Sequence, residues 1–353
     1  MWQISRLLWS STSPLPRRDS VKITFVVWER YHRRSDLLAQ HLGATIHYIQ
    51  CGQRARLLPG VAKYLAQALK AVGRYTVQTW QTWRLLRKER PDVVLVQNPP
   101  VSSVLAVYLY ARQHGARYVV DSHTGAFIMP KWRWSVGLHR MLSRRALATI
   151  VHNKSQAEIV EHWGCRYFVL GFIPGSYPEG EPFPLDGRFN VAVVSTSKED
   201  EPMGVVFEAA ACLPDVSFYV TGDHGRLAAL LAAEKPSNCH LTGYLPYERY
   251  VALLRGADVI LDLTTQDHTL LMGAFEAVSL GTPLIVSDWP VLRDCFSLGT
   301  VHVPNTVEGV CEGVRRAQGD QIMLRRDILR LRDQLCEEWE RAFTALQRLL
   351  QES

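Results

Sequence analysis

The residues whose types are best suited to chemistry lie at the start of a helix that follows a polar loop. Residues 259–288 read VILDLTTQDHTLLMGAFEAVSLGTPLIVSD, which predicts a strand, a hydroxyl-rich loop, a helix from about residue 270 to 280, and a second strand. Amides in the first turn of a helix lack intrahelical partners and attract anions, so those of Leu271, Met272 and Gly273 suit a pyrophosphate. Glu276 in this helix can accept hydrogen bonds from two ribose hydroxyls. A helix carboxylate exposed to solvent is the alternative.

A similar loop follows the strand expected over residues 189–195. Ser195, Thr196 and Lys198 supply hydroxyls and a cation there, just before Pro202, which fits the first position of a helix. Loop amides of this kind also bind the phosphates of a ligand. A simple helix cap explains the same residues equally well.

In the first half of the chain, His123 follows a predicted strand over residues 118–120. Imidazole titrates near neutral pH, so this side chain could transfer a proton. Asp121, two residues earlier, could orient the imidazole or serve as the base itself. A histidine that only caps the loop by a hydrogen bond is the alternative.

Cationic side chains follow the first strand, which we expect over residues 21–28. Arg33 and Arg34 could hold an anionic acceptor such as a lipid phosphate, and surface solubility is the competing explanation. No Asp-x-Asp pair lies at a strand end, so the sequence does not indicate a metal site.

Strands alternate with helices along the chain, which predicts an α/β protein with parallel sheets. At 353 residues the chain is long enough for two domains. After a loose leader over residues 1–20, the pattern is interrupted by four prolines and three glycines between residues 173 and 188, and then restarts. We therefore expect two doubly wound, Rossmann-like domains facing across a cleft, with the bounds 1–172, 173–188 for the linker, 189–320, and 321–353 for a C-terminal helix. That helix could return to the first domain or form a coiled-coil arm.

Charge divides the chain at about the same place. Residues 1–170 hold 25 basic and 8 acidic residues, a net charge of +17, and the remainder holds 15 basic and 26 acidic residues, a net charge of −11. The basic half includes a helical stretch over residues 59–90, which we expect to break near Gly73, and a segment over residues 131–145, both with tryptophans. Cations with aromatic residues suit an anionic membrane surface, whereas attraction between the domains is the alternative.

The chain has no apolar run of 18 residues and no signal-peptide pattern. Its seven cysteines are scattered without a CxxC pair, which favours a reduced protein without a disulfide framework. We expect a cytoplasmic protein that can associate peripherally with the inner face of the membrane.

These features together resemble the two-domain GT-B nucleotide-sugar glycosyltransferases, in particular the family 4-like group. The resemblance extends over nearly the whole chain and is strongest at 191–223 and 241–288, where Glu276 is followed by the Gly281-Thr282-Pro283 turn. His268 occupies the position of an earlier glutamate of the family motif. The resemblance implies that Gly222, Asp223 and Tyr244 line the nucleotide base pocket. It also implies that His123 contacts the donor sugar or phosphate.

The expected function is therefore transfer of a sugar, as by a hexosyltransferase, from a nucleotide-diphosphate sugar to a lipid-linked or glycan acceptor at the membrane. His123, Asp121 and His268 are the candidate catalytic residues, and no cofactor or metal is expected. A nucleotide-sugar epimerase and a non-catalytic binding subunit remain alternatives. Nucleic-acid binding has no supporting motif. The nucleotide base, the sugar and the stereochemistry are left open.

Overall fold

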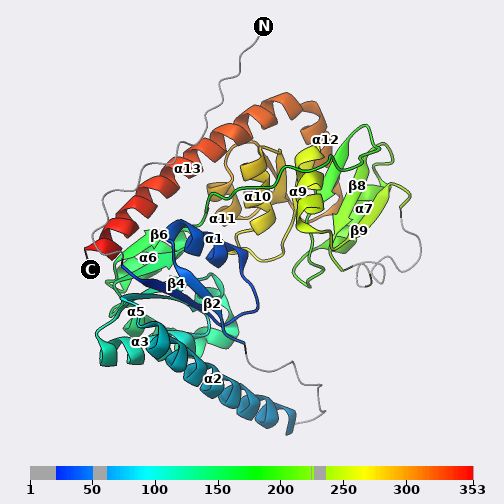
Figure 1. Cartoon of the computed structure of the whole chain (residues 1–353). Helices are drawn as coiled ribbons and strands as arrows, with labels where there is room; N and C mark the ends of the chain where they lie inside the picture. The colour runs from blue at the N-terminus through cyan, green and yellow to red at the C-terminus, as the bar shows by residue number, and fades with distance from the viewer. Residues whose placement is uncertain (1–20, 51–61, 224, 226–235, 353) are drawn as a thin grey trace.

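The computed structural model describes residues 21–50, 62–223, 225 and 236–352, without the side chains of residues 62–70. The leader over residues 1–20 and a helix expected over residues 227–233 lie outside the described residues. The chain forms two α/β domains, each built on a six-stranded parallel sheet with helices on both faces (Figure 1). This architecture confirms the fold expected from the sequence.

The first domain contains a sheet with the strand order β2-β1-β3-β4-β5-β6. Its strands are short and rich in β-branched residues, and the four central ones are largely buried, as parallel strands covered on both faces are. They are β1 (Ile23–Val27), β2 (Thr45–Tyr48), β3 (Val93–Asn98), β4 (Arg117–Ser122), β5 (Ala148–Val151) and β6 (Tyr167–Val169). The helices are α1 (Arg33–Leu42), α2 (Ala62–Glu89), α3 (Val101–His114), α4 (Gly125–Ile128), the 3₁₀ turn η1 (Pro130–Ser135), α5 (Val136–Ser143) and α6 (Lys154–His162).

The second domain repeats the architecture with the strand order β12-β11-β10-β7-β8-β9. Its strands are β7 (Asn190–Val193), β8 (Ser217–Thr221), β9 (Cys239–Gly243), β10 (Val259–Asp262), β11 (Leu284–Ser287) and β12 (Thr300–Val303). Its described helices are α7 (Met203–Ala211), α9 (Tyr247–Gly256), α10 (Met272–Leu280), α11 (Pro290–Cys295), α12 (Val307–Gly319) and α13 (Gln321–Gln351).

The strand orders place one topological switch point in each sheet. The chain reverses direction across the sheet between β1 and β3 in the first domain, and between β7 and β10 in the second. Open parallel sheets bind ligands outside the carboxyl ends of the strands at such points. The loops after these four strands are therefore the places to look for a site.

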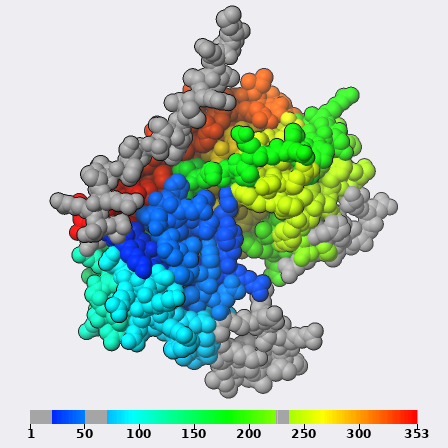
Figure 2. Space-filling view, viewed as in Figure 1, coloured from blue at the N-terminus to red at the C-terminus, as the bar shows by residue number. Residues whose placement is uncertain are grey.

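The C-terminal helix α13 joins the two domains. It packs against α10 of the second domain and β6 of the first, and runs along both in Figure 1. Its Trp339 ring lies 4.5 Å from the ring of His41 in α1. The linker over residues 173–188 crosses the second domain's surface (Figure 2), where Arg255 donates to the Pro178 carbonyl oxygen at 3.0 Å.

Some elements differ from the sequence-based expectation. The helix α2 continues through Gly73 without a break, because one interior glycine costs a helix only about 1 kcal/mol. Pro202 is the N-cap of α7 rather than its first residue. The short helix α11 was not expected, since six residues carry too little periodicity to be recognised.

Candidate functional site

A buried ion pair lies at the carboxyl end of β4. Asp121 is fully buried, and Arg34 at the start of α1 donates to both of its carboxylate oxygens at 2.9 Å. A second guanidinium nitrogen of Arg34 donates to the Leu170 carbonyl oxygen at 2.6 Å. Charge from Arg34 and His123 holds the pKa of Asp121 well below its usual range, despite the opposing effect of burial. Arg34 therefore faces the protein interior rather than an acceptor in solvent.

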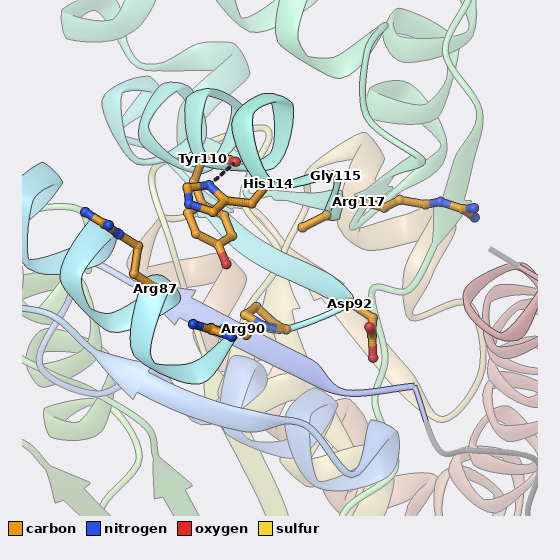
Figure 3. A pocket seen from close by; sticks show the side chains of 9 residues that line it. Arg87, Arg90, Asp92, Tyr110, His114, Gly115 and Arg117 are labelled. Carbon is orange, nitrogen blue, oxygen red and sulfur yellow. Dashed lines mark hydrogen bonds between the residues drawn. The ribbon is translucent and has the colours of Figure 1, made fainter.

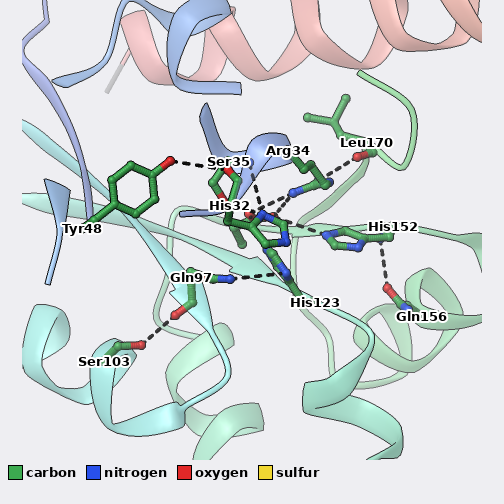
Figure 4. Close-up of polar contacts among 11 residues, drawn as sticks. His32, Arg34, Ser35, Tyr48, Gln97, Ser103, His123, His152, Gln156 and Leu170 are labelled. Carbon is green, nitrogen blue, oxygen red and sulfur yellow. Dashed lines mark hydrogen bonds and ion pairs between the residues drawn. The ribbon is translucent and has the colours of Figure 1, made fainter. Parts of the chain in front are cut away.

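Three imidazoles surround this pair. Nε2 of His123 lies 3.0 Å from Asp121, and the His123 ring packs between those of His32 and His152 at 4.5 and 4.6 Å (Figure 4). Burial lowers the pKa of His32 to about 3 and depresses that of His152 as well. The two flanking rings are therefore neutral near pH 7.

Asp121, His123 and His152 offer ligand atoms within 4.8 Å of one another, a spacing that a metal ion could bridge. However, Arg34 already donates to both oxygens of the carboxylate and supplies the positive charge that a metal would bring. The donor set does not suit a metal ion. Asp121 is better placed to orient the imidazole than to act as a free base.

Glu276 lies where the two domains meet. Its carboxylate accepts a hydrogen bond from the Tyr250 hydroxyl at 2.6 Å and lies 3.9 Å from Nε of Arg33, which belongs to the first domain. The guanidinium of Arg33 also stacks over the rings of Tyr247 and Tyr177, at 4.5 and 5.5 Å. Burial raises the pKa of Glu276, and Tyr250 and Arg33 oppose this effect. Arg33 thus acts in this structure as an interdomain contact.

The loop after β7 already cradles an anion from the chain itself. The carboxylate of Glu201 accepts hydrogen bonds from the backbone amide and hydroxyl of Thr196 at 2.7–3.0 Å, and from the hydroxyl of Ser195 at 2.6 Å. The amide of Lys198 donates to it at 3.3 Å. The donors that the sequence suggested for phosphate therefore converge on one point, as the phosphate hypothesis requires, but a carboxylate occupies that point.

The remaining candidates on this side lie around the same loop. Gly222 has a φ of +117°, and a Cβ there would meet the Ser195 carbonyl at 2.9 Å, so glycine suits this close approach. The amide of Asp223 donates to the Ser197 hydroxyl at 2.9 Å, and the exposed Tyr244 donates to the Thr196 carbonyl at 3.4 Å. The ends of β7, β8 and β9 thus form one surface.

The N-terminus of α10 borders this surface. A Cβ on Gly273 would lie 2.5 Å from Oδ2 of Asp262 and 2.7 Å from the Val194 side chain, so only glycine fits without a shift. Leu271 is the N-cap and provides no side-chain hydrogen bond, and Met272 is the first helical residue. Burial, and then the charges of Glu201 and Glu276, raise the pKa of Asp262 well above its usual range.

His268 lies apart from these groups. Its side chain is 61% exposed, and its Nε2 lies 3.2 Å from the carboxylate of Asp267. The loop that contains His268 contacts the loop between β7 and α7, where the amide of Thr265 donates to the Asp200 carbonyl oxygen at 2.7 Å. Among the described residues, His268 forms no hydrogen bond or ion pair with another candidate residue.

Sequence reasoning missed His152, Glu201 and Tyr250. His152 follows β5, and its place at a strand end could have suggested it. Glu201 lies inside the suspected loop, but carboxylates are not expected in a phosphate cradle. Tyr250 lies within a helix, and nothing in its local pattern indicates that it reaches Glu276.

Family models match both halves of the chain. A model described as "Glycosyl transferase 4-like domain" matches residues 15–174, and one described as "Glycosyl transferase-like" matches residues 204–349. A comparison with curated protein sequences found no match.

Solved structures share the fold over nearly the whole chain. Sucrose-phosphate synthase from Thermosynechococcus elongatus aligns with a TM-score of 0.68 and 14% identity, covering 94% of this chain and 98% of that one. A glycosyltransferase from Rickettsia africae aligns at 0.67 and 12%, covering 95% and 100%. Anabaena HepE in complex with UDP-glucose aligns at 0.64 and 10%, covering 93% and 99%.

Both family models describe glycosyltransferase domains, and together they span the two sheets whose strand ends carry the site. This agreement favours a glycosyltransferase over an epimerase or a non-catalytic subunit. The chain belongs to the glycosyltransferases of the two-domain GT-B fold, with a family 4-like first domain.

Proposed function

We propose that this glycosyltransferase moves a sugar from a nucleotide-diphosphate sugar to a glycan or lipid-linked acceptor at a membrane surface. The observation that carries the proposal is that two adjacent residues, His32 and Arg33, contact candidate residues of both domains. His32 packs against His123 of the first domain, while Arg33 contacts Glu276 of the second. A donor held at Glu276 would therefore present its sugar towards His123.

On the donor side, Glu276 would accept hydrogen bonds from the ribose hydroxyls. The first-turn amides of α10, with Lys198, would stabilise the departing nucleotide diphosphate without a metal ion. The complex of HepE with UDP-glucose supports this type of donor, because that protein shares the fold.

On the acceptor side, His123 would take the proton of the attacking hydroxyl. If its Nε2–H donates to Asp121, its Nδ1 carries the lone pair, and this atom faces the side-chain amide of Gln97 at 3.5 Å. The buried Asp121–Arg34 pair would keep the ring in that tautomer.

A donor panel tests this proposal. The full chain is incubated with UDP-, GDP-, ADP- and dTDP-sugars, and release of the nucleotide diphosphate is measured. We expect one donor class to be hydrolysed slowly and to raise the melting temperature. Glu276→Gln should weaken its binding roughly 10-fold or more, because a hydrogen bond to a charged group contributes about 1.5–3 kcal/mol. No hydrolysis and no thermal shift with any donor would refute the proposal, and unchanged affinity in the variant would refute the role of Glu276.

The membrane part rests on exposed aromatic residues among cations in the first domain. Trp80 of α2 and Trp134 of η1 are 59% and 73% exposed, and the guanidinium of Arg84 lies 5.5 Å from the Trp80 ring. Tryptophan and cationic side chains together favour the headgroup region of an anionic bilayer. No helix of the described residues is long and apolar enough to cross a membrane.

Sedimentation with vesicles tests the membrane part. Binding to phosphatidylglycerol vesicles should exceed binding to phosphatidylcholine vesicles and fall as salt rises. The double variant Trp80→Ser/Trp134→Ser should bind several-fold more weakly. Ile322→Ser, which removes a still more exposed apolar residue on α13, serves as the control. Binding that is absent, insensitive to salt or unchanged in the double variant would contradict this part.

A further inference from the structure

A large cavity opens at the switch point of the first domain. It measures about 960 Å³, and residues after β1, β3 and β4 line it, including His123. The helix α2 and the turn η1 form its sides. Its size is at the upper end of the range of roughly 300–1,000 Å³ that is usual for small-molecule sites.

The cavity contains aromatic rings and buried polar atoms that suit a saccharide. Trp28 and Tyr75 stack at 6.1 Å between centroids, and Trp132 adds a third ring. The side-chain oxygen of Gln97, a residue only 2% exposed, has no hydrogen-bond partner within the described residues, and neither has the indole nitrogen of Trp132. Unpartnered buried polar atoms are rare in folded proteins, and a ligand is one explanation for them.

Its charge is positive. Arg30, Arg74 and Lys131 line the cavity together with one carboxylate, Glu29, which leaves a net charge of 3 − 1 = +2. Across the described part of the chain, none of these three cations forms an ion pair. Cations without an ion pair beside an open cavity favour an anionic group.

From these features we infer that this cavity binds the acceptor, and that the acceptor is a saccharide carrying a phosphate or a carboxylate. The rings would pack on the sugar, and Arg74 and Lys131 would bind the anion. The inference rests on the proposed function and replaces Arg33 and Arg34 as the expected acceptor ligands, because both are engaged elsewhere.

A second basic cavity provides a contrast. It measures about 530 Å³ and lies at the amino end of β4, among Arg87, Arg90 and Arg117 (Figure 3). Its Tyr110 hydroxyl donates to the Leu86 carbonyl at 2.9 Å, and His114 is hydrogen-bonded to the Tyr110 carbonyl. This cavity lies at the edge opposite to the strands' carboxyl ends, away from His123, so it serves as a control.

The test compares anionic and neutral sugars on the full chain without lipid. Binding of glucose 6-phosphate, glucuronic acid, glucose and inorganic phosphate is measured by calorimetry and saturation-transfer NMR. At least one anionic sugar should bind about 10-fold tighter than glucose and tighter than phosphate. The double variant Arg74→Gln/Lys131→Gln should lose this preference and keep glucose binding, whereas Trp132→Phe should weaken both. Arg87→Gln, on the same helix as Arg74 but at the other cavity, should change nothing.

Equal binding of charged and neutral sugars, or an unchanged preference in the double variant, would overturn the inference. Displacement of the sugar by UDP would assign the cavity to the donor and overturn it as well. Donor hydrolysis is measured on the same samples. If hydrolysis persists while discrimination between sugars is absent, only the inference fails; if hydrolysis is absent with every donor, the proposed function fails.

Discussion

The two sheet edges that face each other differ in how their polar groups are satisfied. At the second domain's edge, the polar groups already have partners within the chain. The carboxylate of Glu201 accepts the hydrogen bonds of the loop after β7, and Glu276 accepts one from Tyr250. At the first domain's edge, a buried ion pair underlies a basic cavity with unpartnered polar atoms. At the second edge a ligand must displace the carboxylate of Glu201 from its donors, whereas at the first edge the carboxylate of Asp121 is already paired with Arg34.

This contrast indicates how two similar sheets could serve two substrates. A diphosphate entering the second edge has to compete with Glu201 for the same amides, so affinity depends on an exchange of anions. An anionic acceptor entering the first edge meets cations that form no ion pair among the described residues. The following predictions test the contrast, in order of decreasing effect.

Removing the anchor of the first edge should have the largest effect. Asp121→Ala leaves Arg34 buried without its partner and should lower the free energy of unfolding by about 3–5 kcal/mol. Urea denaturation measures this change. Asp215→Ala, which removes the partner of the exposed Arg315, should have little effect. Similar stability of both variants would show that the pair does not anchor the edge.

Acid should destabilise the first edge next. Burial lowers the pKa of His139, whose Nε2 lies 2.8 Å from the Ser122 hydroxyl, to about 4. Below its ordinary value of 6.5, the unfolded chain binds a proton that the folded chain does not, so stability is complete above pH 6.5 and falls as the pH drops towards 4. The slope for this group approaches about 1.4 kcal/mol per pH unit.

His139→Gln should remove that part of the slope, as measured by urea denaturation between pH 4 and pH 7. The exposed His162 provides the control, since His162→Gln should leave the slope unchanged. An identical slope in both variants would rule out a neutral buried His139.

The second edge should respond in the opposite way, by binding its ligand better when an acid is removed. Glu201→Gln abolishes the negative charge in the cradle and should tighten UDP binding roughly 10-fold, because a charge-assisted hydrogen bond contributes about 1.5–3 kcal/mol. Calorimetry measures the affinity. Glu199→Gln, two residues earlier, is the control. Weaker UDP binding would mean that Glu201 organises the loop for the ligand instead of competing with it.

The smallest effect is expected from Tyr250→Phe. The variant removes one hydrogen bond to Glu276, which contributes on the order of 1 kcal/mol, and leaves the carboxylate in place. UDP affinity should change by less than about fivefold, while Glu276→Gln lowers it more. A larger loss in Tyr250→Phe would assign the ribose contact to the tyrosine.

Much of the fold could be predicted, because buried parallel strands and capped helices have local signatures. The run Val259–Asp262, the left-handed Gly281 and the turn before β11 all appear where the pattern indicates. The site was only partly predictable. Asp121 lies at the end of β4 and Glu276 within α10, as expected, but Arg34 was expected at the surface and is buried against Asp121. Asp121 is 87 residues away in the sequence, and a local pattern cannot reveal a contact between residues so far apart.

By itself, the amino-acid sequence determined two α/β domains, a basic first half and the polar loops at the strand ends, since these follow from hydrophobic period, turn residues and charge. Only the tertiary structure decided which polar groups pair. Strand order sets which loops meet at a switch point, and packing against α13 holds the domains together. Burial then made Arg34 an anchor and Glu201 an internal anion, because a polar group removed from water must find its partner wherever the fold provides one.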